Sequence, residues 1–123
     1  MTRQELTGVR SLEFSQWIRT NLPDSSTGYS VSDLDFIIWN WKTKKIILLE
    51  IKTRMSTPRK GQYLMWNNIE RWIQNGIDSD WMFYGFHFIK FENTNFADGK
   101  VYYDDEEITE NDLNRILSLE SDS

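Results

Sequence analysis

The chain has 123 residues, of which 39% are hydrophobic and 15% aromatic, and its formal net charge is −5; this length and apolar content predict a single domain over residues 1–123. It contains no cysteine, which excludes disulfides, thiolate zinc sites and cysteine nucleophiles and leaves carboxylates as the natural metal ligands. No apolar run is long enough to span a membrane and the N-terminus lacks the apolar core of a signal peptide, so we expect a cytoplasmic protein with no membrane partner.

The first predicted element is an amphipathic helix over residues 9–21, in which Trp17 and Ile18 continue an apolar stripe that begins at Val9. Pro23 ends this helix. The segment that follows, to residue 32, is rich in turn-forming residues and needs no domain boundary. We interpret Asp24, directly after the proline, as a turn residue.

Two apolar segments, residues 34–41 and 46–52, predict the central strands, and the lysine-rich residues 42–45 between them predict a hairpin turn. These strands also carry Asp35, Glu50 and Lys52 where apolar side chains are expected. An ionised carboxylate withdrawn from water is costly unless it is paired or binds a metal. The hairpin is therefore a candidate site for a hard cation such as Mg²⁺ or Mn²⁺.

The pairing of the two strands decides which of these charged groups meet, because side chains in a strand alternate between the faces of the sheet. With a turn of two or four residues, we expect Asp35 opposite Lys52 and Ile37 opposite Glu50. Glu50 is then the diagonal neighbour of Asp35, roughly 7 Å away, and one ion can bridge the pair. A shift by one residue would place the two acids on opposite faces. Asp33 is the alternative first acid, on the same face but nearer the preceding loop.

The next segments predict a helix and then more strands. Thr57 and Pro58 indicate a helix start, and the helix runs to about Asn75 with an inner face formed by Gln62, Trp66, Ile69 and Ile73. Residues 81–91 are almost continuously apolar, as in a strand covered on both faces, and residues 100–103 can pair beside it. His87 in this strand is interpreted as a hydrogen-bonded core histidine. Together the elements predict an α/β fold with a central mixed sheet of about four or five strands flanked by helices.

Charge is unevenly spread along the chain. Residues 104–123 hold eight acids and one base, Arg115, and we expect an acidic C-terminal tail with a short helix that opens at Thr109. The segment from residue 42 to residue 60 holds seven basic residues and one acid, which predicts contacts with nucleic-acid phosphates or, equally, a solvated face. The basic residues proposed to bind nucleic acid are Lys42, Lys44, Lys45, Arg54, Arg59 and Lys60, with Lys52 assigned to the metal site.

An Asp before an apolar strand, about 15 residues and then Glu-x-Lys at the end of the next strand resembles the PD-(D/E)XK nuclease superfamily, which has the restriction-endonuclease-like fold. The resemblance covers roughly residues 9–91 and rests on Asp35, Glu50 and Lys52. It implies that Asp35 and Glu50 bind Mg²⁺ or Mn²⁺ with the carbonyl of Ile51 as a third ligand. It also implies that Lys52 positions and polarises the attacking water.

Two further positions resemble accessory parts of that superfamily. Glu13 on the first helix matches an occasional extra metal or water ligand, and Gln62 followed by Trp66 is similar to the Gln-x-x-x-Tyr pattern of RecB-like nucleases, with tryptophan in place of tyrosine. The placement of Glu13 ahead of a serine-containing loop and the Asp is somewhat similar to archaeal-type Holliday junction resolvases. Small nuclease domains of this type often belong to phages or mobile elements, which would place the protein in the host cytoplasm.

These observations predict a Mg²⁺- or Mn²⁺-dependent deoxyribonuclease that is selective for branched, nicked or end-containing DNA. A chain of this length has no room for a separate recognition domain, so specificity would come from a homodimer or a protein partner. The alternative is a non-catalytic nucleic-acid-binding or assembly module that keeps the same fold. A cross-strand ion pair on an exposed hairpin is the structural explanation that competes with both.

Overall fold

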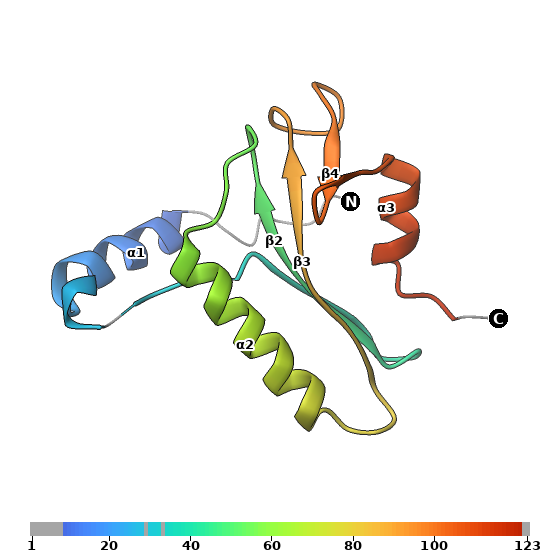
Figure 1. Cartoon of the computed structure of the whole chain (residues 1–123), viewed down its shortest axis with the longest axis horizontal. Helices are drawn as coiled ribbons and strands as arrows, with labels where there is room; N and C mark the ends of the chain where they lie inside the picture. The colour runs from blue at the N-terminus through green and yellow to red at the C-terminus, as the bar shows by residue number, and fades with distance from the viewer. Residues whose placement is uncertain (1–8, 29, 33, 122–123) are drawn as a thin grey trace. The chain divides into compact units, whose positions relative to one another are not determined.

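A computed structural model describes residues 9–28, 30–32 and 34–121 (Figure 1). The chain forms two compact units, Met1–Ser32 and Asp33–Ser123. The first unit holds α1 (Val9–Asn21), as expected, and a short 3-10 helix, Ser25–Thr27. Asp24 accepts a hydrogen bond from the Ser26 N–H, which confirms its place in a turn. Among the described residues, no helix is long and apolar enough to cross a membrane.

The second unit is an α/β structure built on a five-stranded mixed sheet in the order β1-β2-β3-β4-β5. The strands are β1 (Phe36–Asn40), β2 (Lys45–Lys52), β3 (Met82–Phe91), β4 (Val101–Tyr103) and β5 (Glu106–Glu107). Only β2 and β3 are parallel, and α2 (Lys60–Gly76) connects them; the last helix is α3 (Glu110–Leu117). The expected fold class is confirmed, and β5 is the strand that the sequence did not reveal.

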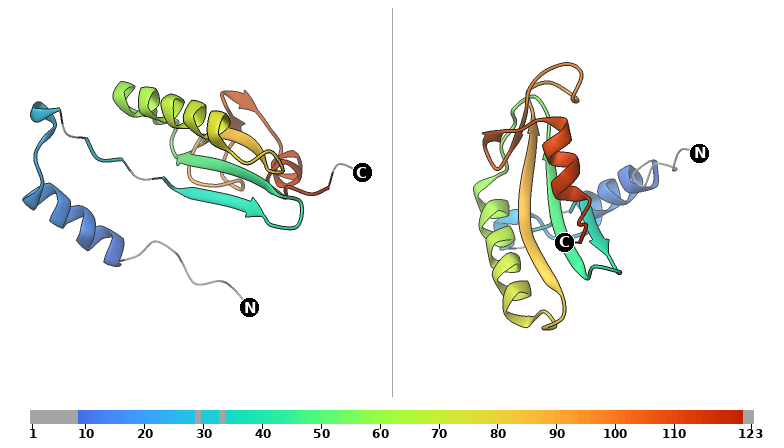
Figure 2. Two further views of the ribbon diagram at one scale, coloured as in Figure 1. Left: turned by 90° about the horizontal axis from the view of Figure 1, so that it is seen from below. Right: turned by 90° about the vertical axis from the view of Figure 1, so that its right-hand side faces the viewer.

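The two helices cover opposite faces of the sheet (Figure 2). On the α2 face, Trp66 packs with Leu48 and with the β3 residues Phe83, Phe86 and Phe88. On the α3 face, Leu113 and Leu119 are buried with Ile47, Leu49, Ile89, Phe91 and Val101. Leu113 and Leu119 therefore join the C-terminal segment, which carries eight acids, to the core. The predicted short helix is present, and the Thr109 hydroxyl caps it by accepting from the Asp112 N–H.

The β1–β2 register differs from the expected one by two residues. Phe36 lies opposite Leu49 and Asn40 opposite Lys45, so the four-residue turn is 41–44. The Asn40 side-chain oxygen accepts hydrogen bonds from the N–H groups of Lys42 and Thr43, and this Asx turn begins the reversal one residue earlier than predicted. Because the shift is even, every side chain keeps its predicted face.

α2 also begins later in the sequence than predicted. The helix begins at Lys60, three residues after the predicted cap, and Arg59 precedes it in an extended conformation without a side-chain cap. After β2 the chain first turns toward β3, where the N–H groups of Arg54 and Met55 bond to the carbonyls of Asn93 and Phe91. These bonds hold residues 54 and 55 in the connection between β2 and α2, so the helix begins later in the sequence than predicted.

Candidate functional site

Asp35 lies directly before β1, and its carboxylate contacts the β2 segment that carries Glu50. The pairing of β1 with β2 ends at Phe36 and Leu49, so Asp35 and Glu50 are the next residues beyond the ladder on the two strands. The Asp35 Oδ2 atom accepts a hydrogen bond from the backbone N–H of Ile51 at 2.8 Å. The first acid is thereby fixed against the backbone of the Glu50-Ile51-Lys52 segment.

Glu50 is withdrawn from solvent, with 2% of its surface exposed. It follows the buried strand residues Leu48 and Leu49, while α2 covers it on one face. Gln62, in the first turn of α2, donates from Nε2 to Glu50 Oε2 at 3.1 Å. A carboxylate in so low a dielectric needs such partners, and it interacts strongly with any cation brought close to it.

Lys52 follows two residues after Glu50 in β2 and so shares its face of the sheet. Among the described residues, no side chain or carbonyl accepts a hydrogen bond from its ammonium group. Its partner in the parallel β2–β3 register is Lys90, a residue that the sequence reasoning missed. A charged residue within an apolar strand was the available signal, but the face it occupies depends on the β2–β3 pairing.

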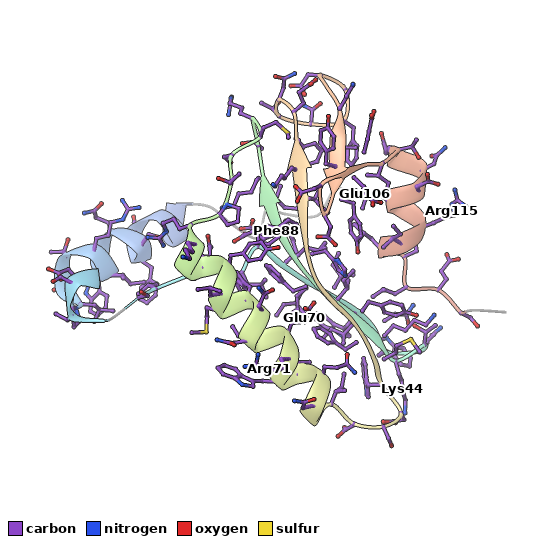
Figure 3. The ribbon with its side chains drawn as sticks, viewed as in Figure 1. Lys44, Glu70, Arg71, Phe88, Glu106 and Arg115 are labelled. Carbon is purple, nitrogen blue, oxygen red and sulfur yellow. The ribbon has the colours of Figure 1, made fainter. Side chains whose placement is uncertain are left out.

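Aromatic residues of β3 and α2 enclose the site on its inner side. Phe88 is the β3 neighbour of Glu50, and its ring stacks on Tyr63 with centroids 5.5 Å apart (Figure 3). Trp66, the aromatic residue four positions after Gln62, is buried and stacks on Phe86 at 4.4 Å. Trp66 therefore anchors the helix that holds Gln62 over Glu50.

The predicted basic segment is divided between two ends of the sheet. Lys45 is buried, and its ammonium donates to the carbonyl of Glu120, so it cannot meet a phosphate without rearrangement. Lys44 is ion-paired with Asp80 at 2.7 Å, and the Lys42 ammonium lies 5.5 Å from the Trp41 ring centroid. This hairpin end lies roughly 23 Å along β2 from Lys52, and Figure 3 shows Lys44 well apart from Phe88. Arg54, Arg59 and Lys60 follow the opposite end of β2, after Lys52.

Two predicted site positions have no described contact with Asp35, Glu50 or Lys52. Glu13 is an exposed residue of α1 in the first unit, and its part in the site stays a prediction. Asp33, the alternative first acid, lies outside the described residues. Within the described part of the chain, no group of three or more His, Cys, Asp or Glu side chains is arranged to hold a metal, so protein carboxylates would supply two ligands, from Asp35 and Glu50.

His87 lies on the other face of β3 and forms a separate polar cluster. Its Nδ1 contacts the Asp104 carboxylate, its Nε2 lies 2.5 Å from the Tyr84 carbonyl oxygen, and its ring stacks on Tyr103. Burial alone would lower the pKa of His87, but these two hydrogen bonds outweigh it and the pKa is raised. Burial likewise opposes ionisation of Asp104, while hydrogen bonds from His87 and the Phe88 N–H hold its pKa below the usual range. The expected hydrogen bonds of the histidine are confirmed, but its side chain is 21% exposed and lies in this polar cluster rather than in the core.

The chain has no counterpart in the comparisons with known proteins: no family model, no curated protein and no solved structure matches it. The chemistry of the site therefore rests on its own residues. These are the carboxylates of Asp35 and Glu50, the Gln62 amide that donates to Glu50, and the Lys52 ammonium. Such a set suits a hard divalent cation beside a phosphate.

Proposed function

We propose that the protein is a metal-dependent nuclease of the PD-(D/E)XK type, with a restriction-endonuclease-like core, that hydrolyses phosphodiester bonds in DNA. The observation that carries the proposal is the joining of Asp35 to the Glu50-Ile51-Lys52 segment by the 2.8 Å hydrogen bond to Ile51. An exposed cross-strand ion pair would leave these groups in water, whereas Glu50 is buried and held by Gln62.

The donor set fits Mg²⁺ or Mn²⁺. Asp35 and Glu50 offer carboxylate oxygens from the residues next beyond the β1–β2 ladder, and the carbonyl of Ile51 is the third ligand that the resemblance implies. All are hard oxygen donors, and Mg²⁺ usually takes one or two carboxylates and completes its shell with water and substrate phosphate. Bound there, the ion would supply Lewis-acid polarisation of the phosphate and a water of lowered pKa.

The residues of the chain provide orientation and charge. Gln62 fixes the Glu50 carboxylate through the 3.1 Å hydrogen bond, and Asp35 is fixed by Ile51. Lys52 presents its ammonium on the same face, where it orients a water and stabilises the negative charge that develops on the phosphate. Phe88, buried beside Glu50 in the β2–β3 register, limits solvent on the inner side.

The substrate class follows from the basic residues near the site. Lys52, Arg54 and Arg59 offer contacts to phosphates, which carry no sequence information, and this favours recognition of DNA structure, such as a branch, nick, end or Holliday junction, over sequence readout. A homodimer or a protein partner would add the second contact that a branched substrate requires. A cytoplasmic location, in the host if the gene is carried by a phage, accords with this role.

A cleavage panel tests the proposal. Wild-type protein is incubated with single-stranded, duplex, nicked, flap and four-way-junction DNA in Mg²⁺, in Mn²⁺ and with the metal chelated. We expect metal-dependent cleavage, strongest on branched DNA, that is lost in Glu50→Gln and Lys52→Met. Glu110→Gln, an exposed acid at the start of α3, is the matched control and should cleave normally. A wild type that binds these DNAs but cuts none would favour the non-catalytic nucleic-acid-binding module.

A further inference from the structure

Lys52 and Lys90 are neighbours near the C-terminal ends of β2 and β3, and these two strands end at the same side of the sheet (Figure 1). They are partners in the parallel register, two residues beyond the pair formed by Glu50 and Phe88. Phe88 packs on the α2 face, and the register is regular from Phe88 to Lys90, so both ammonium groups belong to the face that carries Asp35 and Glu50. Adjacent strands are only about 4.8 Å apart, and like charges at such positions repel.

The position of Lys90 is fixed by its surroundings. Its side chain is 13% exposed, and its ammonium forms an ion pair with Asp105 at 2.8 Å. Asp105 is in the turn between β4 and β5, where Asp104 and Asp105 both have positive φ values of 49° and 72°. Asp104 ties this turn to β3, because it exchanges hydrogen bonds with both the N–H and the C=O of Phe88. Lys90 is therefore held in one place beside Lys52.

The ion pair with the largely exposed Asp105 offsets part of the Lys90 charge, but among the described residues it leaves the neighbouring Lys52 ammonium without an acidic partner. A bound polyanion would provide one, because each phosphate offsets the repulsion between the two cations. We propose that Lys90, positioned by Asp105, binds the phosphate next to the one that Lys52 faces, so that the two lysines hold consecutive phosphates of one nucleic-acid strand. This assignment rests on the proposed nuclease function, which it extends from the scissile phosphate to its neighbour.

The test measures DNA binding with the metal chelated, so that hydrolysis plays no part. The affinity of wild type, Lys90→Met and Lys90→Arg for a short duplex is measured by fluorescence anisotropy over a range of salt concentrations. We expect Lys90→Met to bind about tenfold more weakly at low salt and to lose about 0.9 from the slope of log K against log salt, as for one phosphate contact. Lys90→Arg keeps the charge and should keep the slope.

Arg115→Met is the matched control, since Arg115 is also ion-paired, with Asp112, but lies on α3 on the opposite face of the sheet (Figure 3). Its salt slope should equal that of wild type. A folded Lys90→Met variant with the wild-type slope would overturn the proposal. If Lys90→Met does not fold, the rate of Lys90 acylation in the wild type is compared with and without DNA. Bound DNA should slow this acylation, and an unchanged rate would overturn the assignment.

Failure of the proposed function gives a different pattern. If the wild type binds DNA but cleaves none of the panel, the nuclease proposal is wrong. The salt slope of Lys90→Met still shows whether the lysine contacts phosphate. A wild type that binds no DNA at all overturns both.

Discussion

The Asp35 carboxylate accepts a hydrogen bond from the Ile51 N–H at 2.8 Å, although the two residues are 16 positions apart in the chain. This bond continues the β1–β2 ladder for one step beyond the last backbone pair, Phe36 with Leu49. One oxygen of the carboxylate thus has a structural role, while the proposed metal site needs the negative charge of the same group. The two roles can be separated, because an amide keeps the acceptor and loses the charge.

Asp35→Asn and Asp35→Ala make this separation. The alanine variant leaves the part-buried Ile51 N–H without its acceptor and should lower the free energy of unfolding by about 1–3 kcal/mol. The asparagine variant keeps a carbonyl oxygen in place and should unfold close to wild type. Both variants should lose Mg²⁺-dependent cleavage, because neither retains the carboxylate. Urea denaturation and the cleavage assay measure the two effects independently.

Full cleavage activity in Asp35→Asn would show that the charge at this position is not used and would leave Asp35 with its structural role only. Asp24→Asn is the control for a general effect of removing an acid, because Asp24 caps a turn in the first unit. Its cleavage activity should match that of wild type.

Gln62→Met tests the support of Glu50 from α2. The substitution keeps the length of the side chain but removes the amide that donates to Glu50 Oε2 at 3.1 Å. Loss of a hydrogen bond to a metal-binding carboxylate typically costs 10–100-fold in metal affinity or activity. We therefore expect cleavage to need about 10–100-fold more Mg²⁺, measured by titrating the metal at fixed DNA. Gln74→Met, an exposed change on the same helix, should leave the Mg²⁺ requirement unchanged.

The sequence was sufficient to predict the hairpin, the faces of its charged residues and the inner face of α2, because each follows from a local period and from the position of charge. The register was two residues off because the side chain of Asn40, rather than the lysines, begins the turn. The sequence could not predict the neighbours of residues that depend on long-range strand pairing. Lys90 lies beside Lys52 only because β3 is parallel to β2. Lys45 is buried because the chain near Glu120 returns to the hairpin and accepts its hydrogen bond.

Gly85 lies where the register between β2 and β3 shifts by one residue, ahead of the part of β3 that pairs with Glu50. The β2–β3 register shifts between Ile46 and Leu48, and Gly85 lies in the extra length of β3 with a φ of +94°. An added Cβ would lie 2.7 Å from the Glu70 carboxylate, which accepts the Phe86 N–H (Figure 3). Gly85→Ala should therefore lower the free energy of unfolding by about 1–3 kcal/mol, mostly from the backbone strain.

Gly61→Ala is the control for this glycine. Gly61 lies in α2, where a Cβ added to it would have nothing within 4 Å, so alanine should leave stability unchanged or raise it by up to about 1 kcal/mol. Equal effects of the two substitutions in urea denaturation would mean that Gly85 has no special backbone role.

The C-terminal segment should be required for folding. Leu113 is 3% exposed and Leu119 is 4% exposed, and truncation after Tyr103 removes both from the core. We expect the truncated chain to lack a cooperative unfolding transition in circular dichroism. Leu113→Ala should cost about 2–5 kcal/mol, whereas Ile116→Ala, at a position 38% exposed on the same helix, should cost less than about 1 kcal/mol. A truncated chain that unfolds cooperatively at the wild-type urea concentration would contradict this account.

His87 should make the stability of the protein depend on pH. Both of its ring nitrogens face acceptors, Asp104 and the Tyr84 carbonyl, so the folded state favours the imidazolium and the pKa is raised although burial opposes the charge. A raised pKa in the folded state gives a contribution that is complete below the ordinary histidine pKa, about 6.5, and is lost as the pH rises through the folded value. Asp104, whose pKa is lowered, gives the opposite dependence in acid: its contribution is lost as the pH falls through its folded value.

His87 is the one histidine of the sequence, so a loss of stability as the pH rises above the ordinary histidine pKa can be assigned to it. The free energy of unfolding, measured by urea denaturation from below that pKa upward, should fall with rising pH in the wild type. His87→Gln retains a polar side chain without an ionisable group, and its unfolding free energy should change much less over the same range. A wild-type curve that stays level or rises would show that the imidazolium is not favoured in the folded state. The His87–Asp104 contact would then stabilise the β4–β5 turn as a neutral hydrogen bond, and the position of Asp105 beside Lys90 would be independent of pH.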